Sequence, residues 1–422
     1  MTEPQFRTGE DFAAELDARD PLAHFRERFW IPKTKSDEEC IYLCGHSLGL
    51  QPKTARAYID EELTEWAALG VEGHFHARNP WMPYHRLLTQ QTAALVGAEP
   101  AEVVVMNSLT VNLHLMMASF YRPRGQRHKI LVESGAFPSD QYAVKSQITF
   151  HGLDPATSLL ELTPRKGESC LRDEDIIELI EREGASIALI LLGGVNYATG
   201  QRFDLEEITK AGHKKGCIVG FDLAHAAGNV SLRLHDWGPD FAVWCSYKYL
   251  NGGPGCVAGC FVHARHAKAF QLPRFAGWWG HDEGSRFRMG PDFHPMTGAE
   301  GWQLSNPSIL ALAPLRASME IFAEAGIEPL RAKSVLLTAY MEFLLKQMLP
   351  DDSILTPTEP NRRGAQLSIR VPGGRALCDR LTAEGVIGDW REPDTFRVAA
   401  VPLYNSHRDV YRFAQRFATA SS

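Results

Sequence analysis

The sequence predicts an α/β fold: a large domain with a mainly parallel sheet flanked by helices, followed by a smaller α+β domain. The first observation is an alternation of short apolar runs with stretches of helical spacing between residues 102 and 262, which is typical of a parallel sheet. The second is the length of 422 residues, too great for a single ordinary core. The third is a helical and then strand-like pattern after residue 308.

The elements divide the chain into three expected segments. Residues 1–69 form an N-terminal arm and helices that pack with the small domain, residues 70–307 form the large domain, and residues 308–422 form the small domain. Apolar side chains at helical spacing predict one amphipathic helix over residues 11–29. Near the C-terminus, an apolar strand ends in a turn where Ser406 is placed to cap the last helix.

Composition and charge limit the possible partners. A net charge of −7 and a pI near 6.2 give no basic surface for nucleic acid or for an anionic membrane. The N-terminus lacks the apolar segment of a signal peptide, and no apolar run approaches the roughly 20 residues of a membrane helix. We therefore expect a cytoplasmic protein that acts on a small molecule, with its eight cysteines as free thiols.

Two reactive side chains end two neighbouring apolar runs. Asp222 follows the run 217–221 and Lys248 follows the run 241–245, and both runs are too short for helices. Since the carboxyl ends of parallel strands face the ligand crevice, both side chains are expected in one site. Pyridoxal phosphate (PLP) uses a lysine as its covalent anchor and an acid on its ring nitrogen. The alternatives are a helix-capping aspartate and a solvated surface lysine.

A third strand is followed by a polar turn and a helix. The free amides and the positive dipole of a helix start favour an anion. Phosphate contacts from the amide of Leu109 and from Thr110 are therefore one interpretation of this turn. Taken alone, the turn favours the alternative, plain helix capping by Ser108 or Thr110.

Other patterns point to different chemistry. Gly45-His-Ser47-Leu-Gly49 matches the turn that carries the nucleophile of serine hydrolases, but Pro52 breaks the helix that this turn requires. The glycine motif at 253–258 opens a strand rather than a helix, which argues against a dinucleotide. Cysteines spaced four residues apart in a strand-like run share one face of the strand without binding a metal together, so we expect no metal site.

The most specific sequence stretches surround the two strand ends: Asp222-Leu-Ala-His225-Ala-Ala-Gly-Asn, His235-Asp-Trp-Gly and Trp244-Cys-Ser-Tyr247-Lys248-Tyr-Leu-Asn. They resemble kynureninase, a PLP enzyme of the aspartate-aminotransferase fold, and the similarity extends from about residue 40 to the C-terminus. The resemblance implies that Lys248 and Asp222 hold the cofactor, and it favours phosphate contacts from Leu109 and Thr110 over plain capping. It also implies a phosphate contact and a proton donor at Tyr247, and a polar contact at His225.

The resemblance implies further site residues on loops. Phe137 would stack on the cofactor ring with Asp140 nearby; otherwise Phe137 is ordinary core and Asp140 a first-turn residue of a helix. Gly193 lies where many family members carry serine or threonine. Trp278 and Asn306 would reach the phosphate in the neighbouring subunit of a homodimer with shared active sites.

The substrate contacts are implied in the same way. Arg397 would bind the substrate carboxylate, although an unpaired arginine in an apolar strand equally calls for a structural Asp or Glu. His74, Asn306 and Ser47 would line the aryl pocket, as in members that favour 3-hydroxykynurenine; a solvated-loop His74 and an Asn306 that touches only phosphate are the alternatives.

The implied reaction is hydrolysis of the Cβ–Cγ bond of 3-hydroxykynurenine or kynurenine, in tryptophan catabolism or NAD biosynthesis. Aminotransferase or cysteine-desulfurase chemistry on the same fold is the nearer alternative. A serine hydrolase using Ser47 and a non-catalytic PLP-fold regulator are the others.

Overall fold

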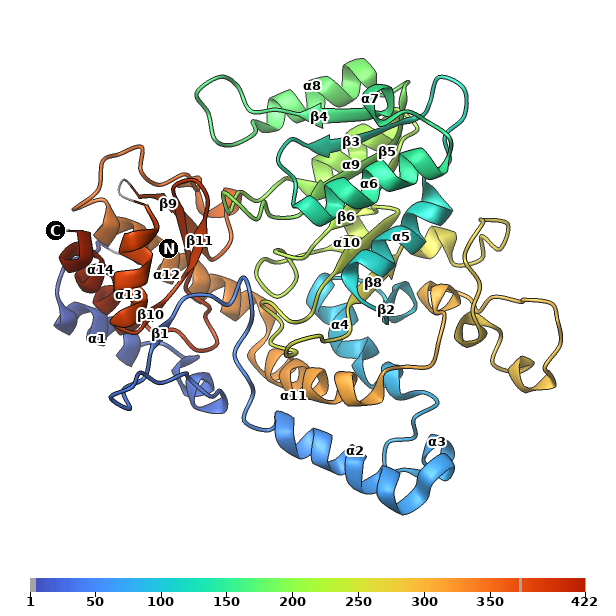
Figure 1. The fold of residues 1–422 in the computed structure, drawn as a ribbon, viewed down its shortest axis with the longest axis horizontal. Coiled ribbons are helices and arrows are strands. Elements are labelled where there is room, and N and C mark those ends of the chain that lie inside the picture. Colours follow the sequence, from blue (N-terminus) through green and yellow to red (C-terminus); the bar gives the residue numbers. More distant parts are fainter. Residues whose placement is uncertain (1–4, 372–373, 422) are drawn as a thin grey trace.

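The computed structural model describes residues 5–371 and 374–421. Its largest element is a seven-stranded sheet, which runs from β4 near the top of Figure 1 down to β2. Only β8 runs antiparallel to its neighbours, so the sheet is mainly parallel, as predicted. In spatial order the strands are β2 (Val103–Val105), β8 (Gly259–Val262), β7 (Phe241–Trp244), β6 (Ile218–Asp222), β5 (Ile187–Gly193), β3 (Lys129–Glu133) and β4 (Leu159–Leu162).

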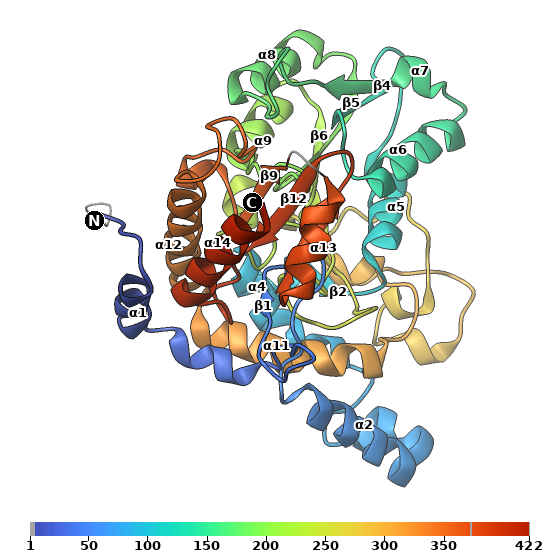
Figure 2. The same cartoon turned by 60° about the vertical axis from the view of Figure 1, so that its left-hand side comes forward.

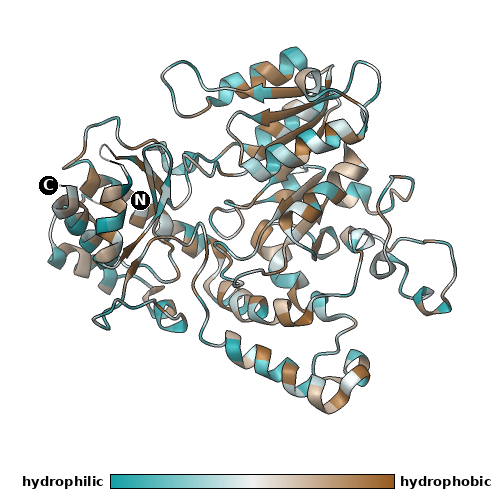
Figure 3. Cartoon of the chain, in the orientation of Figure 1, coloured by the Kyte–Doolittle hydropathy of each residue, from teal (hydrophilic) through white to brown (hydrophobic). Residues whose placement is uncertain are grey.

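The central strands are apolar on both faces because helices cover both sides of the sheet. In β5, Leu189 and Leu191 face one core, whereas Ile190 and Leu192 face the other. The first core includes side chains of α5 (Leu109–Phe120) and α6 (Pro138–Phe150), and the second includes side chains of α8 (Asp173–Glu183) and α9 (Leu205–Lys214). Figure 3 shows the corresponding apolar strands between helices with hydrophilic outer faces.

The register of the parallel strands brings their carboxyl ends together. Gly193 at the end of β5 pairs with Asp222 at the end of β6, and Asp222 pairs in turn with Val243 of β7. The short turn after β7 then carries Lys248. The polar side chains at these strand ends therefore lie along one edge of the sheet.

The C-terminal part is a smaller α+β unit. Its antiparallel sheet contains β11 (Asp389–Arg391), β12 (Thr395–Ala399) and β9 (Gln366–Arg370) in that order. Figure 2 shows α13 (Arg375–Ala383) and α14 (His407–Ser421) in front of these strands, beside α12 (Ile327–Leu345). The expected cap is present, because Ser406 Oγ accepts the Asp409 amide at 3.0 Å.

The N-terminal segment shares a core with this unit. Ala13 of α1 (Glu10–Ala18) and Ile41 of β1 (Ile41–Tyr42) belong to the apolar cluster of α12 and α14. β1 also pairs with β10 (Val386–Ile387). The remaining helices are α2 (Ala55–Leu69), which packs along α11 (Ile309–Ala325), α4 (Thr89–Val96), and the short α3 (Gly73–His76), α7 (Pro155–Ser158) and α10 (Leu234–Trp237).

The prediction of one helix over residues 11–29 is wrong. α1 ends at Ala18, and a separate 3-10 helix spans Ala23–Arg28. Pro21 lies between them and has no amide proton to continue the helical hydrogen bonds. All eight cysteines are free thiols, as expected. Within the described ranges, every helix is too short or too polar to cross a bilayer.

Candidate active site

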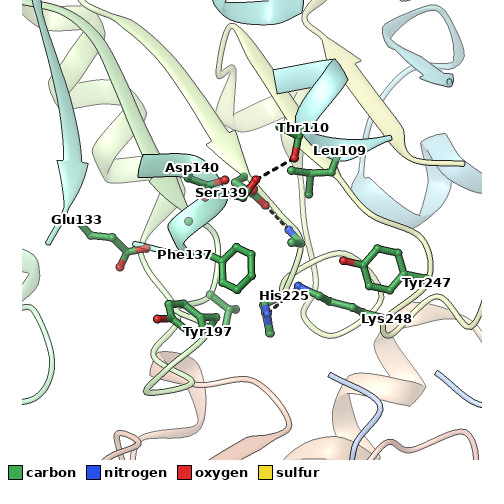
Figure 4. Close-up of a pocket in the computed structure, with 14 residues that line it drawn as sticks. Leu109, Thr110, Glu133, Phe137, Ser139, Asp140, Tyr197, His225, Tyr247 and Lys248 are labelled. Carbon is green, nitrogen blue, oxygen red and sulfur yellow. Dashed lines mark hydrogen bonds between the residues drawn. The ribbon is translucent and has the colours of Figure 1, made fainter. Parts of the chain in front are cut away.

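A pocket opens at the carboxyl ends of β3, β5, β6 and β7 (Figure 4). It brings together residues from five separate stretches of the sequence, as the register of the sheet requires. Eight of the predicted cofactor-site residues line it: Leu109, Thr110, Phe137, Asp140, Asp222, His225, Tyr247 and Lys248.

Asp222 and Lys248 both face this pocket. Asp222 is 8 % exposed, and its Oδ1 accepts the Ala224 amide at 2.7 Å. The residues after it form a turn rather than a helix, so the helix-cap alternative fails. Lys248 is half-buried, and its Nζ lies 3.0 Å from His225 Nε2, which excludes a freely solvated surface lysine.

His225 is the polar neighbour of the lysine. Burial, with the charge of Lys248 beside it, holds the pKa of His225 well below its usual value. The imidazole is therefore neutral at neutral pH, and Nε2 can accept a hydrogen bond from the Lys248 amine. Its other nitrogen, Nδ1, is buried without a protein partner.

Three acids converge in the pocket. Burial and the nearby charge of Asp222 raise the pKa of Asp140 well above its usual value, and Asp140 Oδ1 has no protein partner. Burial also raises the pKa of Asp222. Burial raises the pKa of Glu133 to about 7, although Asn196 Nδ2 donates to this carboxyl at 2.8 Å. Such a set of acids is suited to a cationic group, because positive charge nearby offsets their mutual repulsion.

The starts of α5 and α6 make the pocket suited to an anion as well. α5 starts at Leu109, and Ser108 makes no side-chain cap, so the amides of the first turn are left free. The Thr110 hydroxyl bonds the Ser139 hydroxyl at 2.9 Å, and Ser139 lies in the first turn of α6. Two helix starts and two hydroxyls therefore meet here, which argues against plain capping.

Aromatic side chains form part of the pocket wall. Phe137 is 41 % exposed at the pocket, so it is not a core residue. Its ring meets the Tyr197 ring edge to face, with centroids 5.2 Å apart, as Figure 4 shows. Burial raises the pKa of Tyr247, whose hydroxyl therefore keeps its proton at neutral pH. A flat ring can be held against Phe137 with Lys248 within reach.

Arg397 does not line this pocket but contacts Tyr197, which does, and it is only 1 % exposed. It donates to the Tyr197 carbonyl and forms an ion pair with Asp389. The structural acid considered as an alternative is therefore present. Ser47 is in the same cluster, because its Oγ donates to Asp389 at 2.6 Å and lies 3.5 Å from Arg397 Nη2.

The remaining predicted residues do not line the pocket. His74 lies in α3, where its Nδ1 is 3.0 Å from the Val71 carbonyl and its ring packs on Trp81. Trp278 is 41 % exposed in the loop between β8 and α11, and Asn306 is exposed further along the same connection. We call His74, Trp278 and Asn306 the loop set.

The serine-hydrolase alternative fails on geometry. Ser47 lies in a turn, and the next helix, α2, starts only at Ala55. Its hydroxyl is bonded to a carboxylate rather than to a histidine. A nucleophile elbow requires the helix to start at the serine.

Five pocket residues were not predicted: the polar Glu133, Ser139 and Tyr197, and the apolar Val195 and Ala224. Glu133 is the last residue of β3, so the strand-end argument used for Asp222 could have found it. A Cβ at Gly193 would lie 3.0 Å from Glu133 Oε1, so the absent side chain at 193 leaves room beside this acid. Ser139 stands next to the predicted Asp140, whereas nothing in the loop sequence marks Tyr197.

Comparison with known proteins assigns the chain to a family. A family profile described as "Kynureninase C-terminal domain" matches residues 330–417. A kynureninase from Koribacter versatilis is 69 % identical over 419 residues, covering 99 % of both chains. The chain belongs to the kynureninase family. A kynureninase from Myxococcus xanthus is 60 % identical over 419 residues and 98 % of both chains.

Solved structures of the same fold are more distant in sequence. A cysteine desulfurase from Escherichia coli matches with a TM-score of 0.76 at 18 % identity, covering 94 % of this chain and 98 % of its own. A C-DES variant with glycine covalently linked to its PLP cofactor matches with a TM-score of 0.73 at 17 % identity, covering 90 % and 96 %. These likenesses support the predicted fold class of PLP-dependent enzymes.

Proposed function

We propose that this member of the kynureninase family hydrolyses the Cβ–Cγ bond of 3-hydroxykynurenine in preference to kynurenine. The products are L-alanine and a hydroxylated anthranilate. The observation that carries the catalytic proposal is the meeting of Lys248 and Asp222 in one pocket with an aromatic wall and two helix starts. This arrangement belongs to the large domain, proposed as residues 70–307.

The pocket fits PLP, the cofactor of the family. The free amides at Leu109 and the hydroxyls of Thr110 and Ser139 suit its phosphate. Phe137 would cover its ring, and the Asp222 carboxylate would hold a proton on the ring nitrogen. When bound, PLP provides an aldehyde that bonds an amine and a ring that withdraws electrons from the carbon next to that amine.

The chain's own side chains would transfer the protons and bind the substrate. Lys248, which would hold the cofactor in the free enzyme, would also act as the base that takes the proton from the substrate α-carbon. His225 accepts a hydrogen bond from the lysine at 3.0 Å and positions its amine. Tyr247 keeps its proton at neutral pH and can donate it as the carbon–carbon bond breaks. Arg397, beside the pocket, would bind the α-carboxylate of the substrate.

The proposal further includes a homodimer with shared active sites. The loop set lies away from the Lys248 pocket in its own chain, yet the family resemblance assigns it to the site. The connection around Trp278 also exposes large apolar side chains, with Phe275 and Phe287 each 53 % exposed (the loop drawn in yellow and orange in Figure 1). Exposed apolar surface of this kind is typical of an interface. A partner chain would then supply the three side chains.

Product analysis tests the reaction. Purified protein with PLP is expected to convert 3-hydroxykynurenine into 3-hydroxyanthranilate and alanine in equal amounts. Release of sulfide from cysteine, or transfer of the amino group to a keto acid at a higher rate, would favour the desulfurase or aminotransferase alternatives.

Substrate preference is tested on the loop set. A buried polar group left unpaired costs about 1–3 kcal/mol, enough for roughly tenfold or greater discrimination. We expect wild-type kcat/KM to be at least about tenfold higher for 3-hydroxykynurenine than for kynurenine. The His74→Phe, Asn306→Thr double variant should lose this difference. Equal values on the wild type would refute the preference.

A further inference from the structure

Asp389 is the centre of a charged cluster beside the pocket. It faces Arg397 across the β11–β12 ladder, where the two residues are direct partners. A single oxygen, Oδ2, accepts from Arg397, from Ser47 at 2.6 Å and from Arg391 at 3.0 Å. Asp389 is therefore the carboxylate that three side-chain donors share.

The cluster has more donors than one carboxylate satisfies. Arg397 Nε and Arg391 Nε are buried without a hydrogen-bond partner, and so are both ring nitrogens of His46. His46 is fully buried, with Nε2 3.7 Å from Asp389 Oδ2. Burial and the two arginines beside it hold the pKa of His46 well below its usual value, so His46 is neutral. The charged groups of the cluster are then two arginines and one aspartate, which leave a net positive charge. Room for one further anion is thus built into the charge balance.

The burial of Arg397 explains why Asp389 is needed in the free protein. A guanidinium that is 1 % exposed cannot be solvated by water, and leaving it without a counter-ion costs several kcal/mol. A substrate carboxylate would compete for the same guanidinium. Asp389 could yield Arg397 and still keep its bonds to Ser47 and Arg391.

We infer that Asp389 is a specificity-determining residue: a carboxylate within the chain that occupies Arg397 until the substrate carboxylate displaces it. This inference rests on the proposed role of Arg397. Asp389 thereby weakens the binding of every carboxylate, whereas a ligand without a carboxylate leaves the Arg397–Asp389 pair in place and does not compete with it. A purely structural Asp389, which only orients Arg397, has the opposite effect on affinity.

The test uses the PLP-loaded enzyme and two probes. The first probe is a kynurenine analogue without the α-amine, which keeps the carboxylate but cannot bond the cofactor; the second is the amine without the carboxylate. Asp389→Asn is expected to lower the inhibition constant of the carboxylate probe by about tenfold, because the internal competitor is lost. The amine probe should not gain in the same way. An inhibition constant for the carboxylate probe that rises or stays the same would overturn the inference.

Three further variants control the experiment. Asp394→Asn makes the same change on the turn of the same hairpin, where Asp394 pairs with the exposed Arg370 at 3.3 Å, and should leave both constants unchanged. Asp389→Ser should act in the same direction as Asp389→Asn, and it replaces that variant in the test if Asp389→Asn does not fold. Arg397→Gln should abolish the preference for the carboxylate probe. If Arg397→Gln keeps that preference, the proposed role of Arg397 and this inference both fail. If Arg397→Gln loses the preference but neither Asp389 variant binds the carboxylate probe more tightly, only this inference fails.

Discussion

The strand-end pocket and the loop set differ in how one chain presents them. The pocket residues lie at the ends of adjacent parallel strands or in the first turns of the helices that follow, so the sheet itself gathers them. His74, Trp278 and Asn306 lie on irregular connections and do not reach the pocket in their own chain. A single chain thus brings together the proposed anchor, acid and helix starts of the cofactor site, whereas the phosphate and aryl contacts proposed for the loop set call for a second copy.

The largest expected effect is in the pocket. Lys248→Ala should remove the visible absorption of the bound cofactor and reduce turnover to background, because the covalent anchor and the base are lost together. Absorbance and product assays measure this, with circular dichroism to check the fold. Lys214→Ala, on the exposed end of α9, is the matched control and should behave as the wild type. A Lys248→Ala protein that keeps the band and its turnover would contradict the assignment.

The next effect concerns the acid at the end of β6. Asp222→Ala should reduce kcat by orders of magnitude, because the cofactor ring is left without the carboxylate that keeps its nitrogen protonated. Steady-state kinetics with saturating PLP separates this effect from weak cofactor binding. Near-normal turnover in this variant would remove Asp222 from the mechanism.

Mixing subunits tests directly whether the loop set of one chain completes the pocket of its partner. Lys248→Ala chains and Trp278→Ala chains are each expected to be inactive as homodimers. In a shared-site dimer, each mixed dimer contains one intact site, so random reassociation should restore about one quarter of wild-type activity. Mixed dimers isolated with two different affinity tags should then show about one half of wild-type activity. Proven mixed dimers without activity would place the loop set outside the site.

The smallest effect is on stability. Burial raises the pKa of Glu133 to about 7, so the folded chain keeps a proton that the unfolded chain releases near pH 4.5. The stability from this group is present below pH 4.5 and is lost as the pH rises through 7. Glu133→Gln should therefore stabilise the cofactor-free protein more at pH 8 than at pH 5, by up to about 3 kcal/mol.

Urea unfolding at the two pH values tests this sign. Glu161→Gln, on the exposed side of the neighbouring strand β4, is the matched control and should show no such difference. An effect of Glu133→Gln that is the same at both pH values would show that this carboxyl is ionised in the folded protein throughout the range.

The sequence predicted the sheet and most of the pocket for one physical reason. Short apolar runs report burial, and a polar residue that ends such a run must lie at the edge of the sheet, which placed Asp222 and Lys248 correctly. Phe137 and Asp140 came from the family resemblance, and the structure places both in the same pocket.

The remaining contacts depend on information that a linear pattern does not carry. Asp389 meets Arg397 only because a hairpin sets these two residues opposite each other, and the register of that hairpin was not predicted. The interruption of the N-terminal helix came from one proline, whose effect was outweighed by apolar spacing in the prediction. Tyr197 reaches the pocket from a loop after β5 whose path depends on tertiary packing.

The pairing of β1 with β10 has a consequence for building chimaeras. From Leu43, which bonds the Ile387 carbonyl, the chain needs only six residues to reach Gly49, which bonds the carbonyl of Tyr247 beside Lys248. The two ends of the chain thus form one unit, which we propose comprises residues 1–69 and 308–422. A graft of the C-terminal segment alone would arrive without the strand and the helix that complete its core. Exchanging small domains between family members should succeed only when both termini travel together.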